Sequence, residues 1–277
     1  MASLHPLKSL GSLPYQPGKP MPVLFIGHGS PMNGIENNEF SNKWAKLGNE
    51  IPTPRAVLCV SAHWLTRGTY VTAMENPKTI HDFGGFPQEL FNVQYPAPGS
   101  PDVAEETSKL VKMTTVGMDH EWGLDHGTWT VVRHMYPEAQ VLVLQLSIDY
   151  HQPAGYHYRL GKELNELRKK GVLIIGSGNM VHNLRMVAWD KLNEPEYGFD
   201  WAVEMNDLFK KNILSATHQN LIDYQKLGVN ALKAIPTPDH YYPLLYTLGV
   251  QTNKDEIEIF NDKAVGGSLT MTSVRIG

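Results

Sequence analysis

The sequence has almost no cysteine and no strong excess of charge of either sign. Cys59 is the only cysteine among the 277 residues, so a disulfide within the chain and a cysteine-based metal cluster are both excluded. The 24 lysine and arginine residues are matched by 28 acidic residues, and no basic run occurs, which argues against binding to nucleic acid or to an anionic membrane surface. Any transition metal would have to be bound by histidine and carboxylate side chains.

Long apolar stretches are also missing. No segment approaches the roughly 18 apolar residues of a membrane span, and the N-terminus lacks the apolar core of a secretory signal. Hydrophobic residues nevertheless make up 42% of the chain and charged residues only 19%, a balance typical of a globular protein with a sizeable core. We therefore expect a soluble, cytoplasmic protein.

Four short apolar runs are typical of strands that are buried on both faces of a parallel sheet. These runs span residues 22–27, 56–61, 141–146 and 172–176. Segments with helical spacing of apolar residues lie mostly between them, at 40–47, 102–113, 128–135, 156–169 and 201–214. Because strands alternate with helices, we predict an α/β fold with a mostly parallel central sheet and helices on both of its faces.

Both ends of the chain depart from this alternation. Residues 1–20 contain several proline and glycine residues and no apolar period, which predicts an irregular N-terminal arm. Residues 256–260 and 268–276 alternate between apolar and polar side chains, which predicts an antiparallel pair of strands at the C-terminus. No repeat or change of composition divides the rest, so residues 21–277 are predicted to form a single domain.

The segment 237–240, Thr-Pro-Asp-His, has the residues that favour the start of a helix. Threonine can cap the free N–H groups, proline suits the first helical position, and aspartate complements the positive end of the helix dipole. This pattern predicts a helix with His240 in its first turn. Leu244, Leu245 and Leu248 would then form a buried stripe.

Several of the 12 histidines lie close to the ends of predicted strands. His28 directly follows the first apolar run, His63 the second, and His182 comes shortly after the fourth, whereas His126 lies in a loop before a helix. The carboxyl ends of parallel strands share one edge of a sheet, and ligands of open α/β sheets bind there. These side chains are therefore expected to converge. Neutral imidazoles suit zinc and iron and leave coordination positions open.

The glycines beside two of these histidines resemble the loops that bind phosphate. Residues 27–29 and 176–178 follow strands, yet neither completes the dinucleotide or the P-loop pattern. The contexts of Ser30 and Ser177 do not match the nucleophile pattern of serine hydrolases. Small residues at these positions more simply allow the backbone to pass close to a buried site.

Seven motifs occur in the order found in one enzyme family. They are GHGSPMN around His28, SAHW around His63, HDFGGFP from His81, YPAPGSP from Tyr95, WGLDHGTW around His126, GSGNMVHNLR around His182 and PTPDHYYPLLY around His240. With these motifs the sequence resembles the DODA-type extradiol dioxygenases of the class III extradiol superfamily. These enzymes are similar to the catalytic subunit of protocatechuate 4,5-dioxygenase. The resemblance covers residues 21–277 and implies that this segment is the catalytic domain.

The resemblance implies a set of metal ligands. His28, His63 and His240 would bind one divalent metal, and His182 would be both the acid/base residue and a candidate fourth ligand. Protocatechuate-type members have a glutamate as the third ligand, where this sequence has His240. The missing carboxylate weakens the argument for Fe(II). We expect Fe(II) for dioxygenase activity and keep Zn(II) as the alternative bound species.

The resemblance also implies the reaction and the residues near the substrate. A catechol, DOPA-like or related, would be opened beside its diol with O₂, and His126 would be a second catalytic histidine. His81 and Tyr242 are candidate substrate contacts, although His81 could equally be a loop residue packed on Phe83 or Phe86. Two other functions stay open: a zinc hydrolase that uses the same histidines, with His182 or Asp239 as base, and a non-catalytic relative. The oligomeric state is not indicated.

Overall fold

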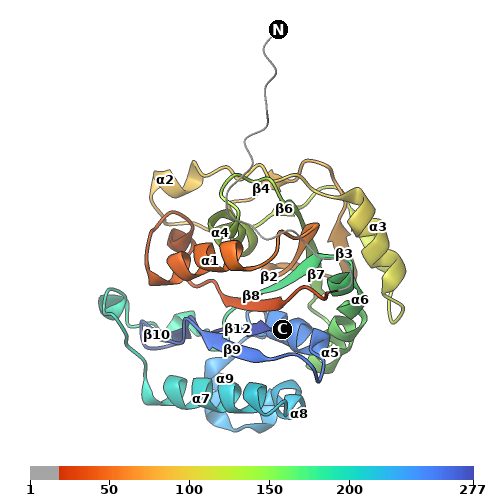
Figure 1. Ribbon diagram of the computed structural model, residues 1–277. Coiled ribbons are helices and arrows are strands. Elements are labelled where there is room, and N and C mark those ends of the chain that lie inside the picture. The colour runs from red at the N-terminus through yellow and green to blue at the C-terminus, as the bar shows by residue number, and fades with distance from the viewer. Residues whose placement is uncertain (1–18) are drawn as a thin grey trace.

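The structure of the protein is a computed structural model that describes residues 19–277, and these are built around one mixed sheet (Figure 1). In this part of the chain the main sheet has eight strands in the order β5-β3-β7-β2-β8-β1-β12-β9. The strands are β1 (Val23–Gly27), β2 (Ala56–Thr66), β3 (Thr69–Thr72), β4 (Lys78–Thr79), β5 (Val116–Asp119), β6 (Gly123–Leu124), β7 (Leu142–Asp149), β8 (Val172–Gly178), β9 (Ile257–Phe260), β10 (Ala264–Val265), β11 (Leu269–Thr270) and β12 (Ser273–Ile276). The helices are α1 (Glu39–Glu50), α2 (Gln88–Phe91), α3 (Pro101–Leu110), α4 (His126–Met135), α5 (Ala154–Glu163), α6 (Asn165–Lys169), α7 (Asp200–Leu214), α8 (His218–Ile222), α9 (Val229–Ala234) and α10 (Tyr242–Val250).

The predicted N-terminal arm is not tested by the structure. The predicted arm, residues 1–20, falls almost entirely outside the described residues and stays a prediction. Within residues 19–277, no helix combines the length and the apolar character needed to cross a bilayer.

The four apolar runs predicted as buried strands form the centre of the sheet. They are β1, β2, β7 and β8, and β1 pairs in parallel with β8, β8 with β2, and β2 with β7. The predicted antiparallel pair is also present, because β12 pairs with β9 and joins the sheet beside β1. The predicted fold class, a mostly parallel α/β sheet with antiparallel C-terminal strands, is therefore confirmed.

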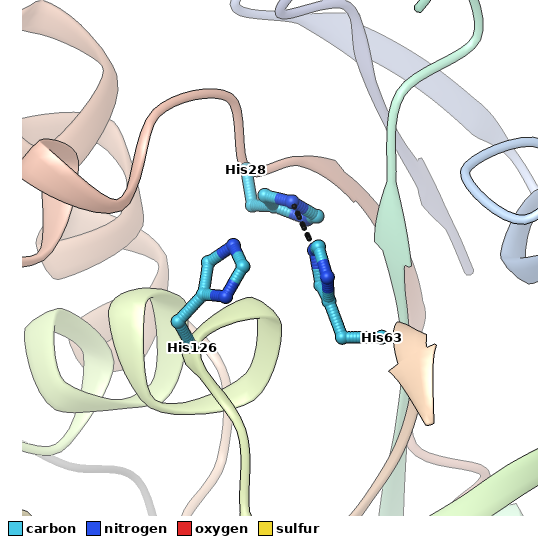
Figure 2. A group of neighbouring side chains, drawn as sticks. All are labelled: His28, His63 and His126. Carbon is cyan, nitrogen blue, oxygen red and sulfur yellow. Dashed lines mark hydrogen bonds between the residues drawn. The ribbon is translucent and has the colours of Figure 1, made fainter. Parts of the chain in front are cut away.

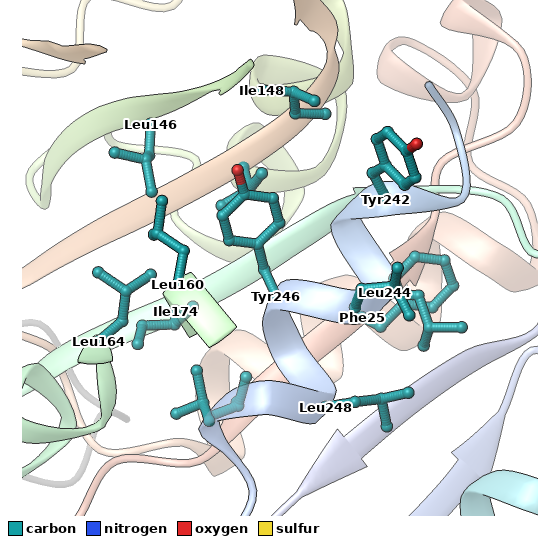
Figure 3. Close-up of a cluster of buried hydrophobic side chains, with 14 of the residues drawn as sticks. Phe25, Leu146, Ile148, Leu160, Leu164, Ile174, Tyr242, Leu244, Tyr246 and Leu248 are labelled. Atoms are coloured by element: carbon teal, nitrogen blue, oxygen red, sulfur yellow. The ribbon is translucent and has the colours of Figure 1, made fainter. Parts of the chain in front are cut away.

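Helices cover both faces of the sheet, so that the strands contribute to two cores (Figure 1). Along β1, Val23 and Phe25 belong to the core shared with α5, α7 and α10, whereas Leu24 and Ile26 belong to the core shared with α1 and α4. Figure 3 shows part of the first core around α10. Each fully buried leucine or phenylalanine stabilises the fold by about 1.5–3 kcal/mol. The strand interiors therefore provide stability, which leaves their ends available for function.

Helix α10 differs from its prediction in its start and in its burial. It begins at Tyr242 and is preceded by a turn, in which the N–H groups of Tyr241 and Tyr242 both donate to Pro238 O (3.0 and 2.8 Å). His240 therefore lies in this turn and not in the first turn of the helix. All nine residues of α10 are buried, since the helix packs between the sheet and α5. The predicted apolar stripe is only part of a helix that is covered on every side.

Other differences concern element boundaries. The helix predicted over 156–169 is interrupted at Leu164, which separates α5 from α6. The C-terminal run 268–276 is divided between β11, which pairs with β10, and β12 in the main sheet. Strands β3 and β5 were not predicted, because with four residues each they are too short for a period to be recognised.

Candidate active site and metal centre

Five histidines meet where the parallel strands end. The ring centroid of His28 lies 5.1 Å from that of His63 and 5.3 Å from that of His240. His126 lies 3.9 Å from His63, and His182 stacks on His240 at 3.5 Å. The Nε2 atoms of His28 and His63 are only 3.1 Å apart (Figure 2). The structure thus brings together the four histidines that were expected to converge at this edge and His240, which the resemblance added.

The ends of β1, β2 and β8 position the first two histidines. His28 follows β1, and its N–H donates to Gly178 O at the end of β8 (3.1 Å). His63 lies inside β2 and not directly after it, because the strand continues to Thr66. The pairing of β2 with β8 nevertheless ends at Ser61, and its pairing with β7 shifts register beyond that point. His63 therefore lies beyond the pairing with β8 and within the irregular stretch of the pairing with β7, which frees its side chain for the site.

His126 is the first residue of α4 and not a loop residue before the helix. Asp125 caps this helix by accepting the N–H of Thr128 (3.1 Å). The same carboxylate accepts hydrogen bonds from the Ser61 hydroxyl and the Gln145 amide, each at 2.7 Å, and all three side chains are fully buried. Asp125 therefore connects the start of α4 to β2 and β7, which fixes the place where His126 enters the cluster.

His182 and His240 lie on two connections that touch each other. The N–H of His182 donates to Ala234 O (2.9 Å), and the N–H of Asn179 donates to His240 O (3.0 Å). A Cβ atom on Gly178 would lie 2.1 Å from His240 O, so only glycine allows the two segments to pass this closely. The two imidazole rings are almost parallel, with 8° between their planes.

The hydrogen bonds of His28 show which of its nitrogens carries the proton. Nδ1 of His28 lies 3.0 Å from the Ser177 hydroxyl. That hydroxyl donates its single proton to Gly127 O, so it must accept a hydrogen bond from His28. Nδ1 of His28 is therefore protonated, and its Nε2 carries a lone pair directed into the cluster.

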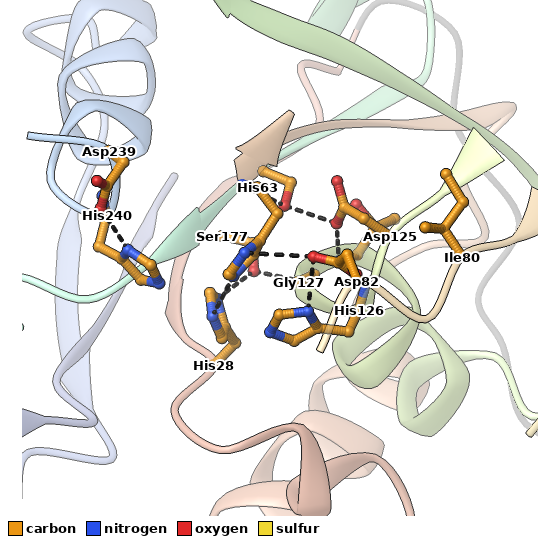
Figure 4. Close-up of polar contacts among 12 residues, drawn as sticks. His28, His63, Ile80, Asp82, Asp125, His126, Gly127, Ser177, Asp239 and His240 are labelled. Atoms are coloured by element: carbon orange, nitrogen blue, oxygen red, sulfur yellow. Dashed lines mark hydrogen bonds and ion pairs between the residues drawn. The ribbon is translucent and has the colours of Figure 1, made fainter. Parts of the chain in front are cut away.

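In three other histidines, a neighbouring carboxylate determines which ring nitrogen carries the proton (Figure 4). Oδ2 of Asp82 lies 2.9 Å from Nδ1 of His126 and 3.3 Å from Nδ1 of His63. Oδ1 of Asp239 lies 2.6 Å from Nδ1 of His240. Because an ionised carboxylate only accepts hydrogen bonds, each of these Nδ1 atoms is the donor and each Nε2 keeps its lone pair.

Burial keeps the histidines neutral. Desolvation, and then the charge of neighbouring histidines, holds the pKa of His28 and of His240 well below the usual value of 6.5. Desolvation also lowers the pKa of His63 to about 3, although Asp82 opposes part of this effect. The pKa of His182 is lowered to about 4, again by desolvation first. The lone pairs are therefore available at neutral pH.

The donor set fits a divalent cation. Two Nε2 lone pairs that face each other at 3.1 Å repel unless a positive charge lies between them. Nitrogen ligands at about 2.1 Å from a tetrahedral metal are about 3.4 Å apart, close to the observed spacing. The potential ligand atoms form two groups, and within each group they all lie within 4.8 Å of one another. The first group is His28, His63 and His126, and the second is His182, Asp239 and His240. Of the predicted ligands, His28 and His63 fall in the first group and His240 in the second.

His81 and Tyr242 lie outside this cluster. Nε2 of His81 hydrogen-bonds to Val93 O (2.9 Å), and its ring contacts Phe83 edge-to-face, which is the packing alternative considered for this residue. Tyr242 stacks on His157 with 4.0 Å between ring centroids. The structure gives neither residue a contact with the histidines of the cluster, so their roles as substrate contacts stay predictions.

The sequence analysis missed the residues that hold the histidines in place. Asp82, Ser177 and Asp125 each lie inside a quoted motif, but none of them was predicted to contact a histidine. The sequence signal that could have identified them is a short polar side chain close to each histidine along the chain. That signal is weak, because the spatial partner is usually a different histidine, as for Asp82 and His126.

Comparisons with known proteins agree with this geometry. The family model for the catalytic LigB subunit of aromatic ring-opening dioxygenase matches residues 20–274. The chain is 47% identical to the 4,5-DOPA dioxygenase extradiol of Escherichia coli K12 over 93% of this chain and 95% of that protein. It is 33% identical to the 4,5-DOPA dioxygenase extradiol of Beta vulgaris, over 91% and 95% of the two chains.

A solved structure supports the same assignment at the level of the fold. The crystal structure of an uncharacterized protein from Escherichia coli K12 superposes with a TM-score of 0.80 at 42% identity, covering 93% of this chain and all of that chain. These matches decide against the hydrolase and the non-catalytic alternatives. The chain therefore belongs to the LigB family, and the protein is a metal-dependent aromatic ring-opening dioxygenase of the extradiol type.

Proposed function

We propose that the substrate is a catechol amino acid such as DOPA, and that its ring is opened beside the diol with O₂. The identity of 47% to a 4,5-DOPA dioxygenase extradiol supports this substrate class. The convergence of five histidines, with the Nε2 atoms of His28 and His63 only 3.1 Å apart, is the observation that carries the reaction type. No other cluster with this donor set occurs among the described residues.

The ligands of the proposed metal are the Nε2 atoms of His28, His63 and His240. Asp82 holds His63, Ser177 holds His28, and Asp239 holds His240, each through Nδ1, so the ligand nitrogens are oriented before any metal arrives. Divalent iron, when bound, supplies open positions for the diol and O₂ and the redox chemistry between them. Zinc would bind the same nitrogens but has no redox chemistry.

His182 is the proposed proton carrier. Burial lowers its pKa to about 4, so at neutral pH its ring is in the form that accepts a proton from a substrate hydroxyl. The same low pKa makes the protonated ring a strong acid, which favours return of the proton later in the reaction. Its stacking on His240 keeps it beside the proposed metal position without requiring it to be a ligand.

His126 is the proposed second catalytic histidine. Its Nδ1–H is held by Asp82, so Nε2 is the atom that it presents to a substrate hydroxyl. The aromatic ring of Phe83 covers its edge at 5.5 Å between centroids. This apolar cover limits the access of water to the reacting atoms.

Oxygen uptake after defined metal loading tests the proposal. Metal-free protein is loaded with Fe(II) without oxygen, and O₂ consumption is then followed with DOPA and with simpler catechols. We expect stoichiometric uptake with DOPA for the iron-loaded protein and none for the zinc-loaded protein. His28→Ala is expected to lose metal binding and uptake together while keeping the folded circular-dichroism spectrum.

The matched control is His120→Ala, because His120 is an exposed histidine that lies outside the quoted motifs. This variant is expected to bind metal and consume O₂ as the unmodified protein does. Absence of uptake over a broad catechol panel with iron bound would contradict the proposed substrate class. Full metal content in His28→Ala would contradict the ligand assignment.

A further inference from the structure

The loop between β4 and α2 contributes one carboxylate that contacts two histidines of different elements. Asp82 lies on this loop, whereas His63 is on β2 and His126 begins α4. Oδ2 of Asp82 is 2.9 Å from Nδ1 of His126 and 3.3 Å from Nδ1 of His63, and Oδ1 accepts the backbone N–H of His126 at 2.9 Å. The Asp82 side chain is 17% exposed, so the protein supplies most of its surroundings.

We propose that Asp82 is a positioning residue that sets the proton position and the direction of a metal ligand, His63, and of a catalytic histidine, His126, at the same time. This inference rests on the proposed function, which gives the two histidines their separate roles. The Asp82 side chain would then influence both metal binding, through His63, and turnover, through His126. In this role Asp82 acts through the two imidazole rings.

The number of donors around Asp82 requires a carboxylate. His126 donates two hydrogen bonds to its two oxygens, one from Nδ1–H and one from the backbone N–H, and Nδ1 of His63 lies 3.3 Å from the oxygen that His126 Nδ1 contacts. An asparagine has one acceptor oxygen and one donor amide in the same place. If its oxygen faces the imidazoles, its NH₂ opposes the backbone N–H of His126. If its NH₂ faces the imidazoles, both rings must move their protons to Nε2, where the lone pairs are needed.

The other supports of the cluster each serve a single histidine. Among the histidines of the cluster, the Ser177 hydroxyl hydrogen-bonds only to the ring of His28, and Asp239 only to the ring and N–H of His240. Loss of either would disturb one ligand. Loss of the Asp82 carboxylate would disturb a ligand and a proton-carrying group together, which gives the proposal a distinct experimental signature.

The position of Asp82 is itself fixed by contacts on its own loop. Trp129 Nε1 donates to Ile80 O (2.9 Å), and the Ile80 N–H donates to Leu124 O (2.8 Å). The next residue, Phe83, lies with its ring edge-to-face against His126. The loop is therefore held on both sides of Asp82, and the carboxylate is held in place before substrate binds. It also lies at the positive N-terminal end of α4, where a negative charge is stabilised.

The test separates metal affinity from turnover in Asp82→Asn and Asp82→Glu. Metal affinity is measured with Co(II) alone, by titration of its visible absorption spectrum, and turnover is measured as kcat for DOPA at saturating Fe(II). For Asp82→Asn we expect about 10–100-fold weaker metal binding and an altered Co(II) spectrum, the range typical of lost partners of metal-bound histidines. We also expect kcat to stay at least about tenfold reduced when the metal site is saturated.

Asp82→Glu keeps the charge and the acceptors but displaces them by one methylene, so it is expected to recover part of both losses. Asp207→Asn is the matched control: it removes an exposed carboxylate on α7 that pairs with Lys210 and should change neither quantity. A carboxylate with a purely structural role would lower stability without changing kcat per bound metal. If Asp82→Asn does not fold, the same two measurements on Asp82→Glu decide.

Two results would overturn the proposal. One is unchanged Co(II) affinity and unchanged kcat in Asp82→Asn. The other is full recovery of kcat at saturating Fe(II), since that would remove the effect on His126. If the unmodified protein binds Co(II) at the cluster but consumes no O₂ with catechols, the proposed function fails instead, and the affinity measurement still tests the link between Asp82 and His63.

Discussion

At the scale of single residues, the cluster depends on burial and on the partners of Nδ1. Desolvation lowers the pKa of His63 to about 3 and that of His182 to about 4, so both rings are neutral at pH 7. Hydrogen bonds from Nδ1 then decide that the lone pair is on Nε2 for the rings held by Ser177, Asp82 and Asp239. An exposed histidine has neither constraint, which is why few of the twelve histidines are suited to this chemistry.

Replacement of His182 by alanine tests its assignment as a proton carrier. Turnover at saturating Fe(II) is expected to fall by about 10²–10⁴-fold, the range for loss of a general acid–base group, while metal affinity changes by less than about tenfold. The physical reason is that His182 stacks on His240 and supplies a proton site beside the predicted ligands. The checks are kcat with DOPA and a metal titration. A loss of metal affinity as large as the loss of turnover would instead place His182 among the ligands.

At the scale of elements, the site forms where strand β2 and helix α4 approach closely. Gly127, the second residue of α4, faces β2, and a Cβ atom there would lie 2.5 Å from the Ser61 hydroxyl and 2.9 Å from the His63 ring. Asp125 connects the same two elements through the Ser61 hydroxyl. The distance between the rings of His63 and His126 is therefore set by how closely the helix can pack.

Gly127→Ala is expected to destabilise the protein by about 1–3 kcal/mol, because the added methyl group overpacks this contact. Metal affinity should fall as well, since the His63 ring is one of the groups that must move. Urea unfolding and a metal titration measure the two effects. The matched control is Gly84→Ala, where a Cβ atom would meet nothing within 4 Å, and it should stay within about 0.5 kcal/mol of the unmodified protein. Equal effects of the two substitutions would refute the importance of the close approach.

At the scale of the whole molecule, stability should depend on pH through a histidine that takes no part in the site. His157 is fully buried, with Nδ1 near the Tyr246 hydroxyl and Nε2 near Gln152 O. Desolvation lowers its pKa from 6.5 to about 4. Between these two pH values the unfolded chain binds the proton and the folded chain does not, so the unfolding free energy decreases as the pH falls through this window and is constant above it.

His157→Gln is expected to flatten this pH dependence. The shift corresponds to on the order of 3 kcal/mol of unfolding free energy lost between about pH 6.5 and pH 4, at about 1.4 kcal/mol for each unit of pKa. The measurement is urea unfolding of metal-free protein at several pH values across this window. The histidines of the cluster are the same in both proteins. The difference between the two slopes of unfolding free energy against pH is therefore due to His157. Identical slopes for the two proteins would show that this residue is not buried as a neutral ring.

Much of the fold was predictable because its signals are local. The apolar runs of β1, β2, β7 and β8 are bounded by breakers and are long enough to recognise, and the alternation in β9 and β12 is equally local. Boundaries were less predictable where tertiary contacts override local preference. At residues 237–240 the sequence favours a helix start, yet the chain makes a turn there and α10 begins at Tyr242.

The candidate site was predictable in part for the same reason. His28 and His63 could be placed near strand ends because each closely follows an apolar run. Asp82 could not be connected to His126, since 44 residues separate them and no local pattern links a loop carboxylate to the start of a helix. The contacts of His81 with Val93 O and of Tyr242 with the His157 ring were equally unpredictable, because they depend on how segments far apart in the chain pack.

By itself, the sequence determined the chemistry available to this protein: a single cysteine, twelve histidines, and apolar runs that are followed by histidines. It also determined that parallel strands would gather these histidines at one edge, because that follows from strand order and direction. Only the tertiary structure decided which histidines face one another, which nitrogen of each ring carries the proton, and which carboxylate holds two of them. Those properties depend on distances between segments far apart in the chain, which packing sets and local sequence does not encode.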